Sequence, residues 1–120
     1  MTILREWRAE IRRSDRDAYA DYVRRTGLAA YTATPGNLGA AIALSDLDDE
    51  RTEIVTLSCW TSMSAIAAFA GSPVDRARYF PEDERYLLTR PERVRHYDLS
   101  GTSLMVDPAG TVQSPEGITP

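Results

Sequence analysis

The first residues of the chain alternate between two kinds of side chain, which is typical of a β-strand. Over residues 3–11, Ile3, Arg5, Trp7 and Ile11 fall on one face, and mostly charged side chains fall on the other. Successive side chains of a strand point to opposite faces of a sheet. The pattern therefore predicts a strand over 3–11 with one buried face.

A helix is expected next. Ser14 is a suitable N-cap, and Asp17, three residues further on, approximates a capping box. Apolar positions then recur at helical spacing, and Gly27 suits the left-handed conformation that ends many helices. We therefore expect a helix from Ser14 to Gly27, followed by a loop over 28–37 that closes in a Thr-Pro-Gly-Asn turn.

The same reasoning predicts the remaining elements. Residues 38–45 and 53–60 are expected to form a hairpin joined by an acidic turn. After the hairpin we expect a helix over 63–70 capped by Ser62 and ended by Gly71, short helices from Pro73 and from Pro81, and a strand over 93–99.

This order of elements, β-α-β-β-α-β, predicts an α+β fold of the ferredoxin-like type over residues 1–99. Its antiparallel sheet would carry all the helices on one face. Residues 100–120 contain several glycines and prolines and few charges, so we expect an extended or disordered tail with one apolar stretch that begins at Leu104.

The expected sheet is apolar on both faces. In its third strand, Ile54 and Trp60 point one way, whereas Val55, Leu57 and Cys59 point the other way. A sheet face in water is normally polar, and each large apolar side chain left exposed forgoes about 1.5–3 kcal/mol. A second copy of the chain is the simplest cover, so we expect a homodimer.

Composition narrows the location and the partners. The net charge is −4 over 120 residues, and all 14 basic residues are arginine, which we attribute to a GC-rich bacterial genome. An acidic chain disfavours nucleic-acid binding. No apolar run approaches the roughly 20 residues of a membrane span, and the start does not look like a signal peptide. With Cys59 as its only cysteine, the chain is expected to be cytoplasmic.

Several short motifs resemble the antibiotic biosynthesis monooxygenase family. They are Ile3-x-Arg5-x-Trp7, Thr56–Ser62 with the Ala-Ile and Phe-Ala-Gly motifs that follow it, Ala77–Asp83, and Val94–Tyr97. The resemblance spans about residues 3–99 and implies the dimeric α/β barrel fold, with a reaction cavity between sheet and helices. Members include cofactor-independent oxygenases of aromatic polyketides, haem-degrading oxygenases, isomerases, and proteins without known activity.

The resemblance also implies roles for single residues. Trp60 stands at the family's cavity tryptophan, whose indole N–H can orient a substrate oxygen or dioxygen; a core position is the alternative. Tyr79 stands where haem-degrading members carry a histidine, and Trp7 stands near their asparagine. Because this chain keeps only the tryptophan of that set, the sequence demands no haem, and it demands no flavin or metal either.

Two further candidates follow from chemistry. Arg5 lies on an otherwise apolar strand face, where an arginine needs either a carboxylate partner or a wet cavity. In a cavity it would stabilise a phenolate, an enolate or a peroxide anion. His96 is the only histidine and a natural general base near neutral pH, with a surface or interface position as its alternative.

The aromatic side chains are expected either to line the cavity or to fill the core. The candidates for contact with a substrate are Trp7, Tyr79, Tyr31, Tyr86 and Phe69. One histidine and one cysteine far apart in sequence form no metal-ligand cluster.

The sequence thus predicts a homodimeric, cofactor-independent oxygenase that acts on an electron-rich aromatic or polyketide-type small molecule. Trp60, Arg5 and His96 are the catalytic candidates. The alternatives are a binding or accessory protein without turnover, a haem-binding member, and a polyketide isomerase or cyclase.

Overall fold

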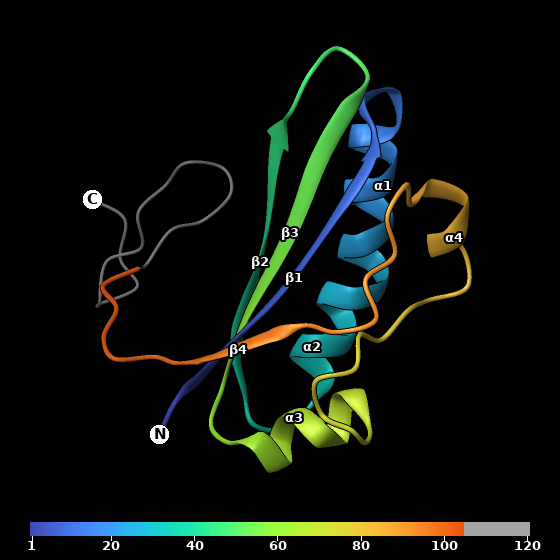
Figure 1. Cartoon of the computed structure of the whole chain (residues 1–120). Coiled ribbons are helices and arrows are strands. Elements are labelled where there is room, and N and C mark those ends of the chain that lie inside the picture. The colour runs from blue at the N-terminus through green and yellow to red at the C-terminus, as the bar shows by residue number, and fades with distance from the viewer. Residues whose placement is uncertain (105–120) are drawn as a thin grey trace.

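The computed structural model describes residues 1–104 and confirms the α+β fold (Figure 1). A 3-10 turn at Arg13–Asp15 precedes the first helix, and a π-helical turn at Arg24–Leu28 joins the first two helices. In chain order the elements are β1 (Ile3–Arg12), α1 (Arg16–Val23), α2 (Ala29–Ala33), β2 (Asn37–Asp46), β3 (Arg51–Trp60), α3 (Met63–Ala70), α4 (Asp83–Tyr86) and β4 (Arg95–Asp98).

The strands form one antiparallel sheet in the order β2-β3-β1-β4, which is the ferredoxin-like order. The two central strands, β1 and β3, pair along ten residues each. β4 is shorter and pairs only with the first part of β1, where His96 lies opposite Arg5. β1 and β3 therefore provide the floor of the core.

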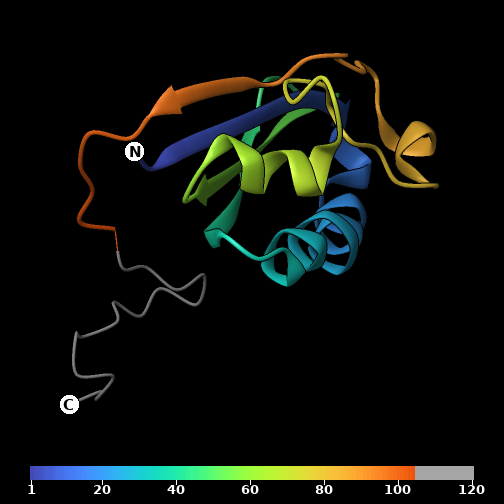
Figure 2. The same ribbon diagram turned by 90° about the horizontal axis from the view of Figure 1, so that it is seen from below.

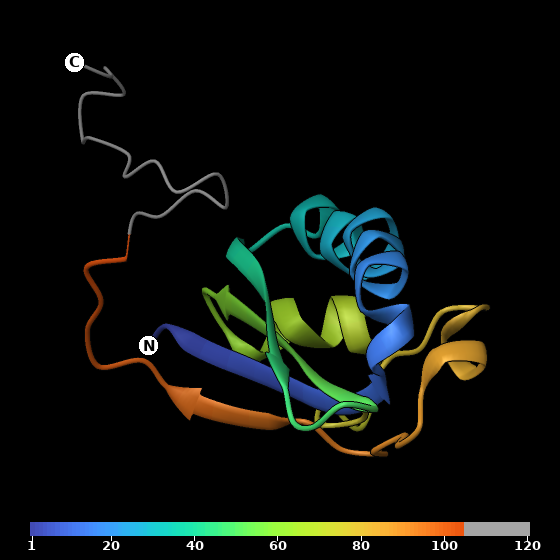
Figure 3. The same ribbon diagram turned by 90° about the horizontal axis from the view of Figure 1, so that it is seen from above.

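The helical layer covers one face of the sheet, as the sequence predicts. α1 and α2 lie over this face (Figure 2, Figure 3), and α3 crosses near one end of the sheet (Figure 1). Two groups of buried side chains fill the space between the layers. One surrounds Tyr19 and Ile54, and the other surrounds Trp60 and Ile66. The candidate site lies between the same two layers.

The expected capping of the first helix by Ser14 is wrong. The chain enters α1 through the 3-10 turn, and Asp15 occupies the N-cap position without a side-chain cap hydrogen bond. The Asp15 carboxylate instead accepts a hydrogen bond of 2.8 Å from Nε of Arg12. A local ion pair with the last residue of β1 therefore takes the place of the expected capping box.

The expected end of the helix at Gly27 is also wrong. The helix continues through the π turn into α2, so most of the predicted loop over 28–37 is helical. Gly36 is the glycine that the turn requires: its φ is 94°, and an added Cβ would lie 2.5 Å from Cβ of Ala65. At Gly27 the same atom would approach Val23 no closer than 3.7 Å. The presence of a glycine therefore did not show whether the helix ends near residue 27 or closer to residue 36.

The prediction for α3 is confirmed. The Ser62 side chain accepts a hydrogen bond of 3.1 Å from the backbone N–H of Ala65, and Gly71 ends the helix with a φ of 82°. No helix begins at Pro73, so that expectation is wrong. Instead, Arg76 in this stretch forms an isolated β-bridge with Arg93, just before β4 at the edge of the sheet.

The face of the sheet away from the helices is mixed. Val55 and Leu57 are partly exposed, and Ala41 opposite Leu57 is exposed. Toward the middle of β1, Arg8 bonds to the carboxylates of Glu6 and Glu53. We call this surface the open face. Over residues 1–104, no element of the chain lies across its apolar part.

The end of the chain is described only as far as Leu104, which is exposed. Residues 99–104 form neither helix nor strand. The predicted tail over 100–120 therefore lies mostly outside the described residues. Within the described part, every helix is too short or too polar to cross a membrane.

Candidate functional site

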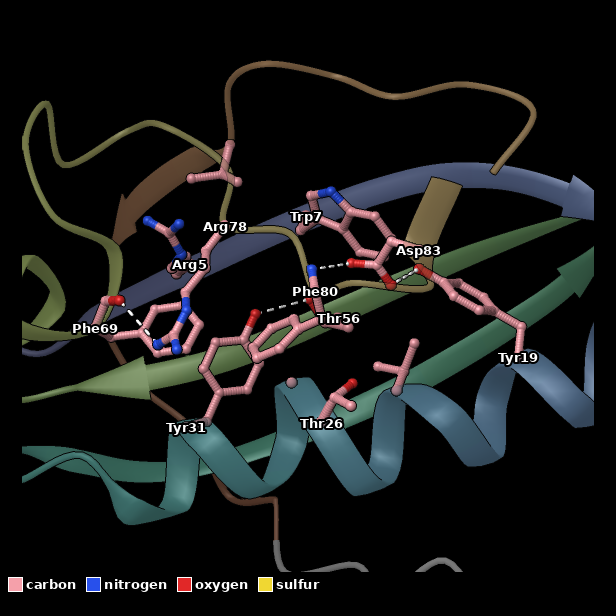
Figure 4. A pocket seen from close by; sticks show the side chains of 13 residues that line it. Arg5, Trp7, Tyr19, Thr26, Tyr31, Thr56, Phe69, Arg78, Phe80 and Asp83 are labelled. Carbon is pink, nitrogen blue, oxygen red and sulfur yellow. Dashed lines mark hydrogen bonds between the residues drawn. The ribbon is translucent and has the colours of Figure 1, made fainter. Parts of the chain in front are cut away.

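A cavity opens between the sheet and the helical layer (Figure 4). Its volume is about 30 Å³, which gives room for about two water molecules. The residues that line it come from β1, β3, the continuous helix from α1 to α2, α3, α4, and the irregular stretches before α4 and β4. They are Arg5, Trp7, Tyr19, Val23, Thr26, Gly27, Tyr31, Thr56, Phe69, Arg78, Phe80, Asp83 and Val94.

Arg5 lies at one end of the cavity and is only 1% exposed. Its two terminal nitrogens donate to the carbonyl oxygens of Val74 and Arg76, at 2.8 and 2.9 Å. Its Nε has no hydrogen-bond partner among residues 1–104. No carboxylate of these residues lies within ion-pair distance of it, and Asp75, whose charge acts on Arg5 from further away, pairs with Arg93. Burial lowers the pKa of Arg5, while the nearby Tyr31 and the charge of Asp75 raise it.

His96 stands beside Arg5 on the helix-covered face. Its Nε2 lies 3.0 Å from Nη1 of Arg5. A guanidinium can only donate, so Nε2 accepts and the ring is neutral. Burial and the charge of Arg5 both lower the pKa of His96, while Asp75 raises it. The sequence left open which face His96 occupies, and the pairing of β4 with β1 places it against Arg5.

Tyr31, Phe69 and Arg78 form the wall over this end. The Tyr31 hydroxyl lies 3.1 Å from Oγ1 of Thr56. The Arg78 guanidinium lies 4.8 Å from the ring centroid of Phe69 and 4.9 Å from that of Phe80, and it donates to the Phe69 carbonyl oxygen. Figure 4 shows Arg78 crossing the Phe69 ring next to Arg5. Arg78 is exposed on its outer side, so it covers the cavity from solvent.

Asp83 and Tyr19 lie at the other end of the cavity, beyond Trp7 from Arg5 (Figure 4). The Tyr19 hydroxyl donates to Oδ1 of Asp83 at 2.9 Å, and the backbone N–H of Phe80 donates to Oδ2 at 2.6 Å. Asp83 is 5% exposed. Burial and the neighbouring Asp83 carboxylate raise the pKa of Tyr19 far above its ordinary value, so its hydroxyl stays protonated and remains a donor.

Trp60 does not line the cavity. It is 0% exposed, and its indole N–H donates to Oγ of Ser58 at 2.8 Å. Its ring packs against Tyr31 and Phe69, with centroid separations of 6.0 and 5.9 Å. The structure therefore places Trp60 behind the cavity wall, where its donor is already used within β3.

Trp7 lines the cavity, whereas Tyr79 and Tyr86 do not. The indole N–H of Trp7 donates to the Tyr79 hydroxyl at 3.2 Å, and that hydroxyl donates to the carbonyl oxygen of Pro91. Tyr79 faces a separate outer groove of about 440 Å³ with the guanidinium of Arg90 over its ring. Tyr86 packs on Tyr19 at a centroid separation of 5.0 Å, in the core.

The structure thus brings together Arg5, Trp7, Tyr31 and Phe69 of the predicted set, with His96 bonded to Arg5. Sequence reasoning missed Tyr19, Thr26, Arg78 and Asp83. Thr26 and Gly27 face the cavity from the π turn, a local widening of a helix that often occurs at functional sites. The motif Ala77–Asp83 contained Arg78 and Asp83, but no periodicity in that irregular stretch showed which of its side chains point inward.

This arrangement can bind a small oxyanion beside a cation and among aromatic side chains. It has a neutral imidazole next to the cation and a carboxylate at the far end. Within residues 1–104, no three His, Cys, Asp or Glu side chains are grouped so that they could hold a metal ion.

Comparison with known proteins shows the fold alone. No protein-family model matches the chain, and no curated protein matches it. Among solved structures, the chain is similar to Rv0793 from Mycobacterium tuberculosis, with a TM-score of 0.55 and 20% sequence identity. The match covers 87% of this chain and 100% of the other. At this identity the likeness supports the ferredoxin-like α+β fold and leaves the chemistry to be argued from the cavity.

Proposed function

We propose that this protein is a homodimeric, cytoplasmic oxygenase that acts on an electron-rich aromatic or polyketide-type small molecule without a cofactor. One observation carries the proposal: Arg5 is buried in an aromatic-lined cavity with no carboxylate partner among the described residues and with a free Nε. A buried cation without a counter-ion is unfavourable unless something anionic joins it.

A phenolate or enolate is an anion that suits this cavity. The cavity, at about 30 Å³, would have to widen to admit it. Its ring would then lie among Trp7, Tyr31 and Phe69, and its oxygen would take the donors of Arg5. A positive charge in a poorly solvated site favours the ionised form of a bound phenol or enol. The carbanion character that ionisation creates is what lets an electron-rich ring react with dioxygen directly.

His96 is the base in this proposal. As arranged, its Nε2 lone pair accepts from Arg5. A substrate oxygen that takes over the Arg5 donor would release this lone pair, and His96 would then accept the proton that the substrate loses. Substrate binding and deprotonation are coupled through one hydrogen bond.

The reaction balances without an added reductant. In an anthrone-type substrate, a ring methylene becomes a carbonyl. One atom of dioxygen becomes the carbonyl oxygen, and the other leaves as water with the two methylene hydrogens. The substrate supplies every electron.

The homodimer is supported by the open face. Val55, Leu57 and Ala41 lie there at least partly exposed, although a sheet face in water is normally polar. A symmetric partner that packs its own open face on this one would close the two sheets into a barrel. The cavity would then lie on the outer side of each sheet, under its helices.

Oxygen uptake with anthrone tests the proposal. Wild type should consume oxygen above the rate of an enzyme-free blank. Arg5→Gln should lower kcat/KM about a hundredfold, as expected for loss of an oxyanion-stabilising donor. Arg24→Gln removes an exposed arginine that pairs with Asp21 and should leave the rate unchanged. Uptake by wild type no faster than the blank would refute the proposal.

A binding protein without turnover is the second candidate. It is favoured because two of the side chains predicted to be catalytic are already engaged within the chain: Trp60 donates to Ser58, and His96 accepts from Arg5. This candidate predicts that hydroxylated anthraquinones raise the midpoint of thermal unfolding while anthrone causes no oxygen uptake above the blank.

A further inference from the structure

The cavity beside Arg5 has the size of a small ion. Its volume of about 30 Å³ gives room for about two water molecules. Two water molecules take up about 60 Å³ of liquid, which is space for an ion of about three or four non-hydrogen atoms. The donors and acceptors that the lining leaves unused decide which kind of ion fits.

Arg5 leaves two of its N–H groups unused. A guanidinium has five N–H donors and no acceptor. Nη1 uses both of its hydrogens, on the carbonyl oxygen of Val74 and on Nε2 of His96, and Nη2 uses one, on the carbonyl oxygen of Arg76. Nε is buried and has no partner among residues 1–104. The unused donors are therefore Nε–H and one hydrogen of Nη2, and two donors of one planar group can bind two oxygens of the same anion.

The hydroxyl groups of Tyr31 and Thr56 add a third donor. They lie 3.1 Å apart, and either can donate to the other (Figure 4). Two hydroxyls carry two hydrogens and this bond uses one, so one hydrogen is left over within the described part of the chain. Both residues line the cavity together with Arg5, and Tyr31 is near enough to raise the pKa of Arg5. A third donor is therefore available in the same small space.

The other polar side chains of the lining are already engaged. The Thr26 hydroxyl donates to a backbone carbonyl oxygen of α1. At the far end of the cavity, both carboxylate oxygens of Asp83 accept hydrogen bonds. The Arg78 guanidinium lies beside Arg5 and adds a second positive charge (Figure 4). The Arg5 end therefore offers unused donors and positive charge.

We propose that the Arg5 end of the cavity binds a small planar oxyanion with two acceptor oxygens, of the formate or bicarbonate class. The anion takes the two unused N–H groups of Arg5 and the spare hydroxyl hydrogen of the Tyr31–Thr56 pair. Water satisfies these donors but leaves the buried charge uncompensated, which is unfavourable. The inference shares its cavity with the proposed function but requires no oxygenase activity. Such an anion would compete with a substrate oxygen for Arg5.

Three ligands test the inference by binding alone. Formate is the probe, formamide has nearly the same size without the charge, and pivalate carries the same carboxylate on a bulky group. Formate should bind wild type about tenfold more tightly than formamide, because hydrogen bonds between charged groups are the stronger ones. It should also bind more tightly than pivalate, which is too large for the closed space.

Nuclear magnetic resonance measures each Kd at neutral pH and constant ionic strength. Backbone amide signals around the cavity report binding in every variant. The Nε–H signal of Arg5, assigned through the carbons of its own side chain, should shift with formate and thereby show that the anion binds at this group.

Variants test the donors one group at a time. Arg5→Gln should weaken formate binding about tenfold, because it removes the charge and the paired donors. Tyr31→Phe combined with Thr56→Val should weaken it about fivefold. Either of these single changes should have a smaller effect, since the remaining hydroxyl keeps its hydrogen. The double variant is expected to fold, because replacing both partners of a hydrogen bond is nearly neutral. Arg24→Gln, at an exposed position, should keep the wild-type Kd.

The outcomes also separate this inference from the proposed function. Formate that moves no cavity signal, binds no better than formamide, or binds no better than pivalate would overturn the inference. An affinity that neither Arg5→Gln nor the double variant lowers, with each variant shown to be folded by circular dichroism, would do the same. Formate binding by a chain that takes up no oxygen with anthrone would refute only the oxygenase proposal. Oxygen uptake without formate binding would refute only this inference.

Discussion

A neutral histidine accepts a hydrogen bond from a buried arginine at the inner end of the cavity. Arg5, His96 and the carbonyl oxygens that Arg5 contacts form one hydrogen-bond network. Because Arg5 donates to Nε2 of His96, that nitrogen carries no proton. Protonation would set two cations 3.0 Å apart. Asp75 is the acidic group whose charge opposes this repulsion. The network is therefore sensitive to pH.

The protein should lose stability as the pH falls below about 6.5, the ordinary pKa of histidine. The folded pKa of His96 is lowered, so the unfolded chain binds the proton more readily and stability rises with pH. The full contribution is present above the unfolded pKa and is lost as the pH falls toward the folded pKa. Urea unfolding at pH 7.5 and pH 5.5 measures the difference. His96→Gln keeps an acceptor without titrating and should reduce it; an unchanged difference would contradict this account.

At the scale of single residues, the sequence located Arg5 because a charge stood out against an apolar strand face. It could not locate Asp83, since acidic residues in an irregular stretch carry no periodic signal. Trp60 shows a different limit. Its place at the end of β3 was clear, but whether its N–H faced a ligand depended on Ser58, two residues away on the same face of the strand.

At the scale of elements, two glycines show where local sequence signals can and cannot predict the end of a helix. Gly36 needs a positive φ in the turn before β2, whereas Gly27 sits inside a continuous helix. Both looked like helix ends or turns in the sequence. Tertiary packing of the helix on the sheet outweighed the local preference of Gly27, because the following turns bury Tyr31.

Alanine should act in opposite directions at these two glycines. Gly27→Ala should stabilise the fold by about 0.5–1 kcal/mol, because glycine in a helix interior is unfavourable relative to alanine, and the new Cβ would have ordinary contacts. Gly36→Ala should destabilise it by about 2 kcal/mol, since it adds both left-handed strain and a clash with Ala65. Urea unfolding measures both. A destabilised Gly27→Ala or a neutral Gly36→Ala would be inconsistent with the positions described.

At the scale of the whole molecule, the ferredoxin-like α+β fold, with its helices on one face of an antiparallel sheet, followed from alternation and element order, and this is the part of the fold that the sequence predicted well. Long strands with one strongly buried face leave few alternatives. The open face is the part that a single chain does not explain. It combines partly exposed Val55 and Leu57 with the ion pairs of Arg8.

Leu57→Glu should convert the proposed dimer into monomers, because a carboxylate on the apolar part of the open face would be buried without a partner in the dimer. Sedimentation velocity at micromolar concentration should give twice the chain mass of 13.4 kDa for wild type and the chain mass for the variant. Met63→Glu, an equally drastic change at an exposed position of α3, should leave the dimer intact. Wild type that sediments as a single chain would exclude the dimer.

The wide turn at Arg24–Leu28 also bears on how the chain can vary in length. A π-helical turn accommodates a residue more than an α-helical turn does. Deleting one residue there would restore a plain helix and leave the residues after it in phase, so that Tyr31 would still reach Thr56, whereas a deletion from the regular turns of α1 would rotate everything after it by about 100°. A homologue one residue shorter in this turn should therefore keep that hydroxyl pair, and with it this wall of the cavity.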